Sequence, residues 1–281
     1  MTSYADFHRD SLVNRDAFWA QQAELVDWQS PPQQICDYSN PPFAKWFVGG
    51  TTNLCHNAVD RHLTERAEQA ALIFVSTETN EERVYSFREL HAEVQRMAAS
   101  LKALGVGKGD RVLIYMPMIA EAAFAMLACT RIGAIHSVVF GGFASGSLAS
   151  RIEDASPKVV ISADAGSRGG KAVAYKPLLD EAIRLSSHKP DAVLLVDRGL
   201  VAMALVAGRD HLWHDLRETQ TTARFAHTSN YHGATAHWYE LTGHKWFCSV
   251  PQSDGFFTLA KVDGEVTCFF LPRTLPDGSF N

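Results

Sequence analysis

The chain has 281 residues, of which 46% are hydrophobic and 20% are charged, as in an ordinary globular protein. Its formal net charge of -5 and pI of about 6.2 offer no basic face, so we expect no nucleic-acid partner. The start, MTSYADFHRDS, lacks a signal-peptide core, and the longest apolar runs are too short to span a bilayer. We therefore expect a cytoplasmic protein with no membrane segment.

The first sixty residues are rich in aromatic side chains and have no clear period, and residues 57–69 have helix character. Pro31-Pro32 and Pro41-Pro42 divide the aromatic-rich part into short pieces. This composition predicts an irregular N-terminal arm, residues 1–70, whose aromatic rings attach it to a larger body.

The first strong order begins at Ala71. The runs ALIFV and ERVYSF predict two strands joined by the turn TETNE. Ser86 and Glu89 form the capping-box pattern Ser-x-x-Glu, which predicts the start of a helix. Gly105 follows the last apolar position of that helix and is expected to end it.

Apolar strands and helical segments alternate from there to Val196. Strands that are apolar throughout, separated by helices, predict an α/β fold with a mainly parallel sheet and helices on both faces. Ligands of such sheets bind at the carboxyl ends of the strands, in the loops that lead into the helices. The expected order of segments is RVLIYM, EAAFAMLACTRI, AIHSVVF, SLASRIEDA, KVVISA, YKPLLDEAIRLSS and AVLLVD.

The period changes to that of strands from His237. HWYELTGHKWFCSV predicts one hairpin, and FFTLAKVDGEVTCFFL predicts a second with Asp263-Gly264 as its tight turn. The sequence therefore predicts a small β-rich segment after the α/β body, with a boundary between residues 215 and 235.

One candidate site is the loop AGSRGGKAVAYK, which follows the strand KVVISA. Arg168 and Lys171 flank Gly169 and Gly170, and glycines let a backbone approach a phosphate while the cations supply charge. A basic surface loop without a ligand explains the same residues equally well.

A second candidate is the loop FGGFA at the end of the preceding strand. The ring of Phe140 is suited to stacking on a base, and Gly141 and Gly142 permit close approach of a ligand. Taken alone, however, these residues favour a strand-to-helix turn with a packed aromatic ring.

The remaining motifs carry no chemistry. The segment GGTTN, residues 49–53, lacks the Gly-Lys of a phosphate-binding loop and is interpreted as a turn. Twelve histidines and five cysteines include no metal-ligand spacing and no CxxC pair, so we expect reduced thiols and no metal. No catalytic residue is assigned.

Most of the chain, residues 1–217, resembles the N-terminal part of AMP-forming short-chain acyl-CoA synthetases. The segments that carry the resemblance are highly specific, and DRGLVAMALVAGRD at 197–210 is more similar to propionyl-CoA synthetases than to acetyl-CoA synthetases. The other segments are FW at 18–19, WFVGGTTNLCHNAVDRHL at 46–63, GDRVLIYMPMIAEAAFAMLACTRIGAIHSVVFGGFA at 109–144 and RGGK at 168–171.

The resemblance implies an acid–thiol ligase that adenylates a carboxylic acid with Mg-ATP and then transfers the acyl group to CoA. It implies that Phe140, Gly141 and Gly142 lie near the CoA adenine and that Arg168 to Lys171 hold its phosphates. The family's Ser/Thr/Gly-rich ATP loop, its acyl pocket, its ribose-binding aspartate and its C-terminal lid with the adenylation lysine are not found here. We therefore expect a truncated chain that is catalytically inactive by itself.

The last part, residues 218–281, resembles the middle β-domain of flavin acyl-CoA dehydrogenases of the alkylation-response branch. YELTGHKWFCSVPQSDGFFTLAK and CFFLPRTLPDGSFN carry this resemblance, which implies that Phe247, Cys248 and Ser249 face an FAD. The expected organisation is an arm (1–70), a partial AMP-binding domain (71–217) and a dehydrogenase-like fragment (218–281). A flavin dehydrogenase fragment and a weak CoA-binding remnant without activity are the alternative functions.

Overall fold

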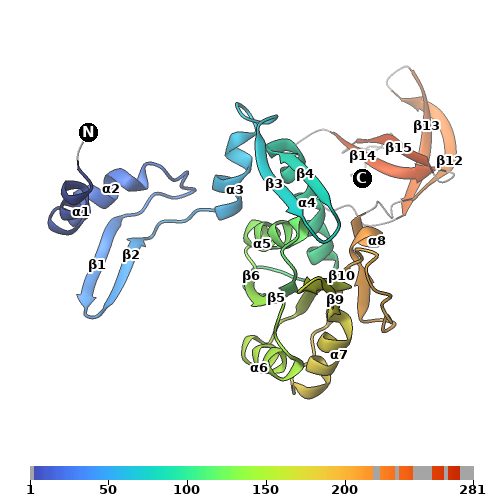
Figure 1. Cartoon of the computed structure of the whole chain (residues 1–281). Helices are drawn as coiled ribbons and strands as arrows, with labels where there is room; N and C mark the ends of the chain where they lie inside the picture. Colours follow the sequence, from blue (N-terminus) through green and yellow to red (C-terminus); the bar gives the residue numbers. More distant parts are fainter. Residues whose placement is uncertain (1–2, 218–221, 232–233, 243–254, 263–264, 273–281) are drawn as a thin grey trace. The chain divides into compact units, whose positions relative to one another are not determined.

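The computed structural model describes the backbone of residues 3–217, 222–231, 234–242, 255–262 and 265–272. Side chains are described from residue 3 to residue 216, with the exception of Arg168. The chain divides into two compact units, Met1–Asp210 and His211–Asn281. Figure 1 labels the helices and strands in chain order.

The N-terminal segment is more regular than the sequence predicts. It forms helices α1 (Tyr4–Val13) and α2 (Arg15–Ala23), a hairpin of β1 (Gln34–Asn40) and β2 (Phe43–Val48), helix α3 (Leu54–Ala58) and a 3₁₀ turn, η1 (Asp60–His62). The prediction of an irregular arm is therefore wrong. Its aromatic rings contact one another edge-on, with centroid separations of 4.8 Å for Phe7–Phe18, 5.2 Å for Phe18–Trp19 and 5.8 Å for Trp19–Trp46.

A hairpin and a capped helix follow, as predicted. Strands β3 (Ala70–Ser76) and β4 (Glu81–Ser86) pair antiparallel and lead directly into α4 (Phe87–Ala103). The Ser86 hydroxyl accepts from the Glu89 N–H at 3.2 Å, while the Glu89 carboxylate accepts from the Ser86 N–H at 2.8 Å. The capping box thus fixes the start of α4, and Gly105 takes a positive φ of 82° just beyond its end.

The central sheet confirms the predicted α/β class. Strands β5 (Arg111–Met116), β6 (Ile135–Phe140), β7 (Val159–Ala163) and β10 (Ala192–Val196) pair in parallel, and the sheet has the order β11-β10-β7-β5-β6 with β11 at Asp210–Leu212. Every residue of β7 and β10 is buried, as is every residue of β5 after Arg111. Burial on both faces explains why these strands are almost entirely apolar, and the buried Ser162 of β7 donates its hydroxyl to the Tyr115 carbonyl at 2.8 Å.

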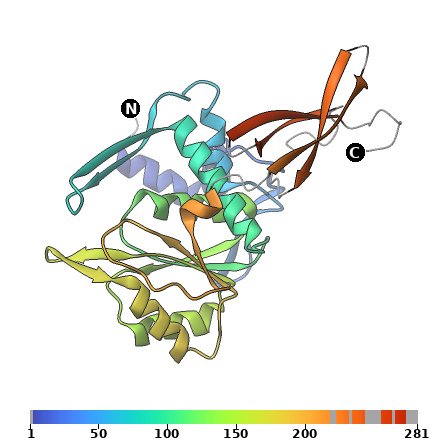
Figure 2. The same ribbon diagram turned by 90° about the vertical axis from the view of Figure 1, so that its right-hand side faces the viewer.

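Two pairs of helices cover the sheet. Helix α4 packs on α5 (Ala120–Ile132), and α6 (Ser145–Ala155) packs on α7 (Tyr175–Leu185). The two views show the α6–α7 pair on the face of the sheet opposite α5 (Figures 1 and 2). Among the described residues, no helix is both long and apolar enough to cross a membrane.

The loop that was expected between β7 and α7 is itself a hairpin. Strands β8 (Ala165–Arg168) and β9 (Lys171–Ala174) pair antiparallel, with Arg168 opposite Lys171. Gly169 and Gly170 form its turn with φ values of 59° and 76°. A two-residue hairpin turn of type I′ needs positive φ at both positions, which explains both glycines without a ligand.

The second unit contains a four-stranded sheet, as the strand periodicity predicts. After helix α8 (Trp213–Arg217), strands β12 (Thr222–Tyr231), β13 (Ala234–Thr242), β14 (Gly255–Val262) and β15 (Glu265–Pro272) follow, in the sheet order β13-β12-β14-β15. The hairpin predicted within FFTLAKVDGEVTCFFL is confirmed as β14–β15. The other predicted hairpin is displaced, because β13 pairs with β12 and residues 243–254 lie outside the described part.

Candidate functional site

A cavity of about 720 Å³ opens where three neighbouring strands of the parallel sheet end. Its walls come from the loop after β5, from the end of β6 and the glycine loop that follows, and from the β8–β9 hairpin with the start of α7. This is the edge at which the fold class predicts a ligand site. The lining residues are Glu78, Met116, Pro117, Met118, Val138, Val139, Phe140, Gly141, Gly142, Phe143, Ala144, Ser167, Val173, Tyr175 and Leu178.

The side chain of Tyr175, the first residue of α7, packs against two glycines in this region, Gly141 and Gly166. A Cβ on Gly141 would lie 2.2 Å from the Tyr175 hydroxyl oxygen, and a Cβ on Gly166 would lie 2.6 Å from the same atom. The Tyr175 ring also stacks on Tyr115 of β5, with centroids 4.9 Å apart. Gly141 and Gly166 are therefore required by an aromatic side chain, which is a structural reason that the sequence did not reveal.

Tyr115 connects the sheet to the glycine loop. Its hydroxyl donates to the backbone carbonyl of Phe143 at 3.1 Å. Burial, together with the neighbouring Tyr175, raises the pKa of Tyr115 to about 12. Burial also raises the pKa of Tyr175, assisted by the charge of Glu78. Both phenols are neutral at physiological pH, so both rings act here as packing surfaces, and the Tyr115 hydroxyl also donates a hydrogen bond.

The three residues predicted near the adenine all line the cavity. Phe140 is 73% exposed at the end of β6, and its ring meets Phe143 edge-on with centroids 6.0 Å apart. Phe143 in turn carries the guanidinium of Arg151 over its ring at 4.2 Å. A large apolar ring with an exposed face, held from one side only, is suited to stacking on a planar ligand.

The RGGK segment is adjacent to the cavity rather than part of its wall. Ser167 lines the cavity, whereas Gly169, Gly170 and Lys171 do not. A Cβ on either glycine would meet nothing within 4 Å, so this tip of the hairpin is open on the side of those positions. Lys171 is exposed and has no ion-pair partner among the described side chains, and Arg168 is described only by its backbone.

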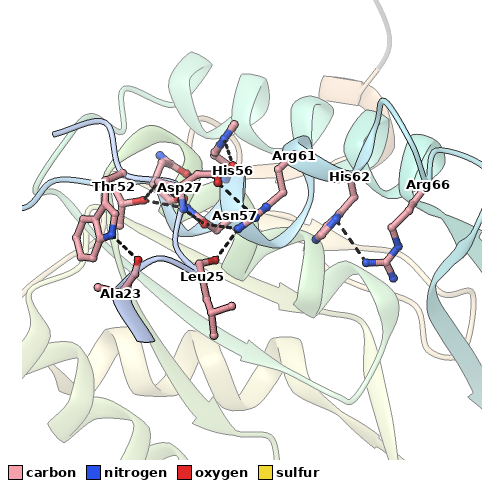
Figure 3. Close-up of polar contacts among 11 residues, drawn as sticks. Ala23, Leu25, Asp27, Thr52, His56, Asn57, Arg61, His62 and Arg66 are labelled. Atoms are coloured by element: carbon pink, nitrogen blue, oxygen red, sulfur yellow. Dashed lines mark hydrogen bonds and ion pairs between the residues drawn. The ribbon is translucent and has the colours of Figure 1, made fainter. Parts of the chain in front are cut away.

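A polar cluster around Asp27 lies in the N-terminal segment (Figure 3). The Asp27 carboxylate lies 3.3 Å from the His56 Nε2 and 3.3 Å from the Arg61 guanidinium. Its backbone carbonyl accepts from Thr52 at 2.7 Å and from the Asn57 amide at 3.2 Å. These contacts connect the loop after α2 to α3 and η1, which gives these polar residues of the segment 46–63 a structural role.

The GGTTN segment proves to be a connector, in agreement with its interpretation as a turn. The Asn53 side chain accepts from the His56 N–H at 3.1 Å, which caps α3. Its amide donates to the carbonyls of Thr130 and Arg131 at 3.0 and 3.1 Å, at the end of α5.

No group of three or more His, Cys, Asp or Glu side chains in the described part is arranged to hold a metal ion. The residues predicted to face a flavin, Phe247, Cys248 and Ser249, lie outside the described residues.

Comparisons with known proteins agree with this architecture. The chain matches the model of the AMP-binding enzyme family over residues 59–227 and that of the acetyl-coenzyme A synthetase N-terminus over residues 4–58. It is 58% identical over 222 residues to the propionate–CoA ligase of Escherichia coli (strain K12), covering 79% of this chain and 35% of that protein.

Two further relatives extend the comparison. The acetyl-coenzyme A synthetase of Methylobacterium radiotolerans is 48% identical over 222 residues, covering 78% of this chain and 34% of that protein. The solved acetoacetyl-CoA synthetase from Streptomyces lividans matches with a TM-score of 0.70 and 28% identity, over 86% of this chain and 35% of that chain. This chain thus spans about a third of the length of these relatives. It belongs to the AMP-binding enzyme family, as an N-terminal acyl-CoA synthetase region close to propionate–CoA ligase.

Proposed function

We propose that the chain supplies the CoA-facing part of an AMP-forming short-chain acyl-CoA synthetase, a propionate– or acetate–CoA ligase. The observation that carries the proposal is the cavity at the ends of β5 and β6, in a chain 58% identical over 222 residues to a propionate–CoA ligase. In the complete reaction Mg-ATP activates the carboxylate as an acyl-adenylate, and the CoA thiol then displaces AMP.

The proposed CoA contacts divide into two groups. The exposed ring of Phe140 offers a face for the adenine, with Gly141 and Gly142 beside it in the cavity wall. Arg168 and Lys171, on either side of Gly169 and Gly170, would attract the phosphates at the adjacent hairpin tip. Because both glycines lack side chains, a phosphate could reach the backbone there.

A binding measurement tests this assignment. We expect the purified 281-residue chain to bind CoA in titration calorimetry, and Arg168→Ala or Lys171→Ala to weaken binding and reduce its dependence on salt. Stability should change by less than about 0.5 kcal/mol, as at ordinary surface sites. Lys45→Ala, which removes an exposed cation from β2, is the matched control. A marked loss of stability in Arg168→Ala, with unchanged CoA affinity of the protein that remains folded, would show that the hairpin is structural.

We further infer that the 281-residue polypeptide does not complete the ligase reaction by itself. In-line reaction of ATP with a carboxylate depends mainly on positioning and on preorganised charge. The ATP loop, acyl pocket and lid expected from the family are not recognised in this sequence. Propionate-dependent release of pyrophosphate by the purified chain is the measurement, and activity above background would contradict the inference.

The proposed organisation keeps three parts, residues 1–70, 71–217 and 218–281, of which the last is a fused acyl-CoA dehydrogenase-like fragment. Flavin binding through Phe247, Cys248 and Ser249 is the alternative function that this fragment suggests. It predicts a yellow purified protein with a flavin absorbance band, and a colourless protein that does not take up added FAD would count against it. A cytoplasmic location stays a prediction.

A further inference from the structure

Two segments far apart in the sequence contact strand β8 and each other. They are the turn between β3 and β4, which carries Glu78, and the loop after β10, which carries Arg198. Glu78 is also part of the cavity wall. Glu78 lies in the predicted turn TETNE and Arg198 lies in the segment DRGLVAMALVAGRD, but no local pattern indicates a contact between residues 120 positions apart.

The Glu78 carboxylate has a partner for each oxygen. Oε1 accepts from the backbone N–H of Ser167 at 3.1 Å, and Oε2 accepts from the Arg198 guanidinium at 2.8 Å. The same guanidinium donates to the backbone carbonyl of Ala165 at 2.9 Å. Glu78 and Arg198 therefore hold β8 at two of its four residues, on the strand that leads to the RGGK turn.

Both supports of β8 are themselves fixed. The Ser76 hydroxyl accepts from the Thr79 N–H at 3.2 Å, which closes the turn around Glu78. Asp164 is completely buried, and its carboxylate accepts from the N–H groups of Ala165 and Leu200, both at 2.7 Å. Asp164 thus joins the start of β8 to the loop of Arg198.

Charge also favours a positioning role over a binding role. A free carboxylate in the wall of a site for a polyphosphate would repel its ligand. The Arg198 side chain is 9% exposed and the Glu78 side chain 27% exposed, so the pair is partly shielded from water and the opposite charges cancel locally. Glu78 can therefore remain in the wall without opposing an anionic ligand.

We propose that Glu78 is a positioning residue that holds the β8–β9 hairpin, and with it the Arg168 and Lys171 cations, in the orientation needed to bind CoA. The proposal rests on the proposed CoA-binding function. It assigns to Glu78 no contact with the ligand, only control of the hairpin that carries the cations.

The test compares Glu78→Ala and Glu78→Gln with Glu82→Ala, an exposed carboxylate on β4 of the same β3–β4 hairpin. Hydrogen exchange of the full chain without ligand is the first measurement. In Glu78→Ala the amides of residues 165–174 should exchange at least about tenfold faster, the effect of losing roughly 1.4 kcal/mol of local stability, with the central sheet unchanged. Glu78→Gln retains an acceptor for Ser167 and should show a smaller increase, while Glu82→Ala should match the parent.

CoA titration is the second measurement. Glu78→Ala should weaken CoA binding about tenfold and Glu78→Gln less, with Glu82→Ala unchanged. If the parent chain does not bind CoA, the proposed function fails, and the exchange measurement still decides whether Glu78 holds the hairpin. If the parent binds CoA but Glu78→Ala leaves both affinity and local exchange unchanged, the positioning role is wrong. Faster exchange throughout the unit would show general stabilisation and would also overturn it.

Discussion

Substitution of Gly141 by alanine should destabilise the first unit, although the residue lies in a loop. The new Cβ would lie 2.2 Å from the Tyr175 hydroxyl oxygen, 2.8 Å from its Cζ and 3.0 Å from its Cε2. Cβ atoms in folded proteins essentially never approach another heavy atom to within 3.0 Å. Either the tyrosine or the loop must therefore move.

Tyr175 has little room to move. Its hydroxyl end lies between Gly141 and Gly166, and its ring stacks on Tyr115, which is completely buried in the sheet. Overpacking of such a site costs about 1–3 kcal/mol. For a unit of this size, each kcal/mol lowers the melting temperature by about 2–4 °C.

Urea denaturation followed by circular dichroism measures the effect. Gly146→Ala is the control, because a Cβ at that position in α6 meets nothing within 4 Å. It should leave stability unchanged or raise it by up to about 1 kcal/mol, since alanine favours a helix more than glycine does. In a Tyr175→Ala background, Gly141→Ala should cost little, which a double-mutant cycle detects. A Gly141→Ala variant as stable as the parent would refute the packing argument.

Three further predictions concern stability. Glu153 accepts hydrogen bonds from Ser187 and Ser186, which lower its pKa below 4.5, so its stabilising contribution is present at neutral pH and is lost as pH falls through the folded pKa. The stability difference between the parent and Glu153→Gln should accordingly shrink on acidification below about pH 4.5, and a difference independent of pH would contradict this. Asn53→Ala should cost about 1–2 kcal/mol in urea denaturation, because the α3 cap and two bonds to the end of α5 are lost, and a cost under about 0.5 kcal/mol would show that water replaces them. Tyr115 has a folded pKa of about 12 against 10 for an ordinary tyrosine, so its contribution is complete below pH 10 and is lost as pH rises through 12. Alkaline destabilisation should therefore be weaker in Tyr115→Phe, and an identical pH profile would contradict the assignment.

The central sheet could be predicted well from the sequence, because burial of its strands determines which residue types they contain. Strands β7 and β10 are buried at every residue, and such strands are predominantly apolar. The capping box at Ser86 is equally visible, because both partners lie within one helical turn. Helix α1 is different, since it buries none of its residues and has no apolar stripe to detect.

In the candidate site, too, local features could be predicted from the sequence, whereas tertiary contacts could not. Phe140 and Gly141 were recognisable because Phe140 ends a predicted strand and Gly141 follows it directly. The reason for a glycine at position 141 could not be recognised from the sequence. Tyr175 lies 34 positions later, and its hydroxyl approaches Gly141 only when α7 packs beside the sheet. The contact of Glu78 with Arg198 is likewise tertiary, and no local pattern records it.

The glycines of this site have two different structural roles, neither of which involves a ligand. Gly141 and Gly166 make room for the Tyr175 hydroxyl, whereas Gly169 and Gly170 supply the positive φ of a hairpin turn. Neither pair therefore requires a phosphate to explain it. Under the proposed function, the cavity wall and the hairpin cations serve separate ends of one ligand, and the contacts of Glu78 and Arg198 with β8 connect the two.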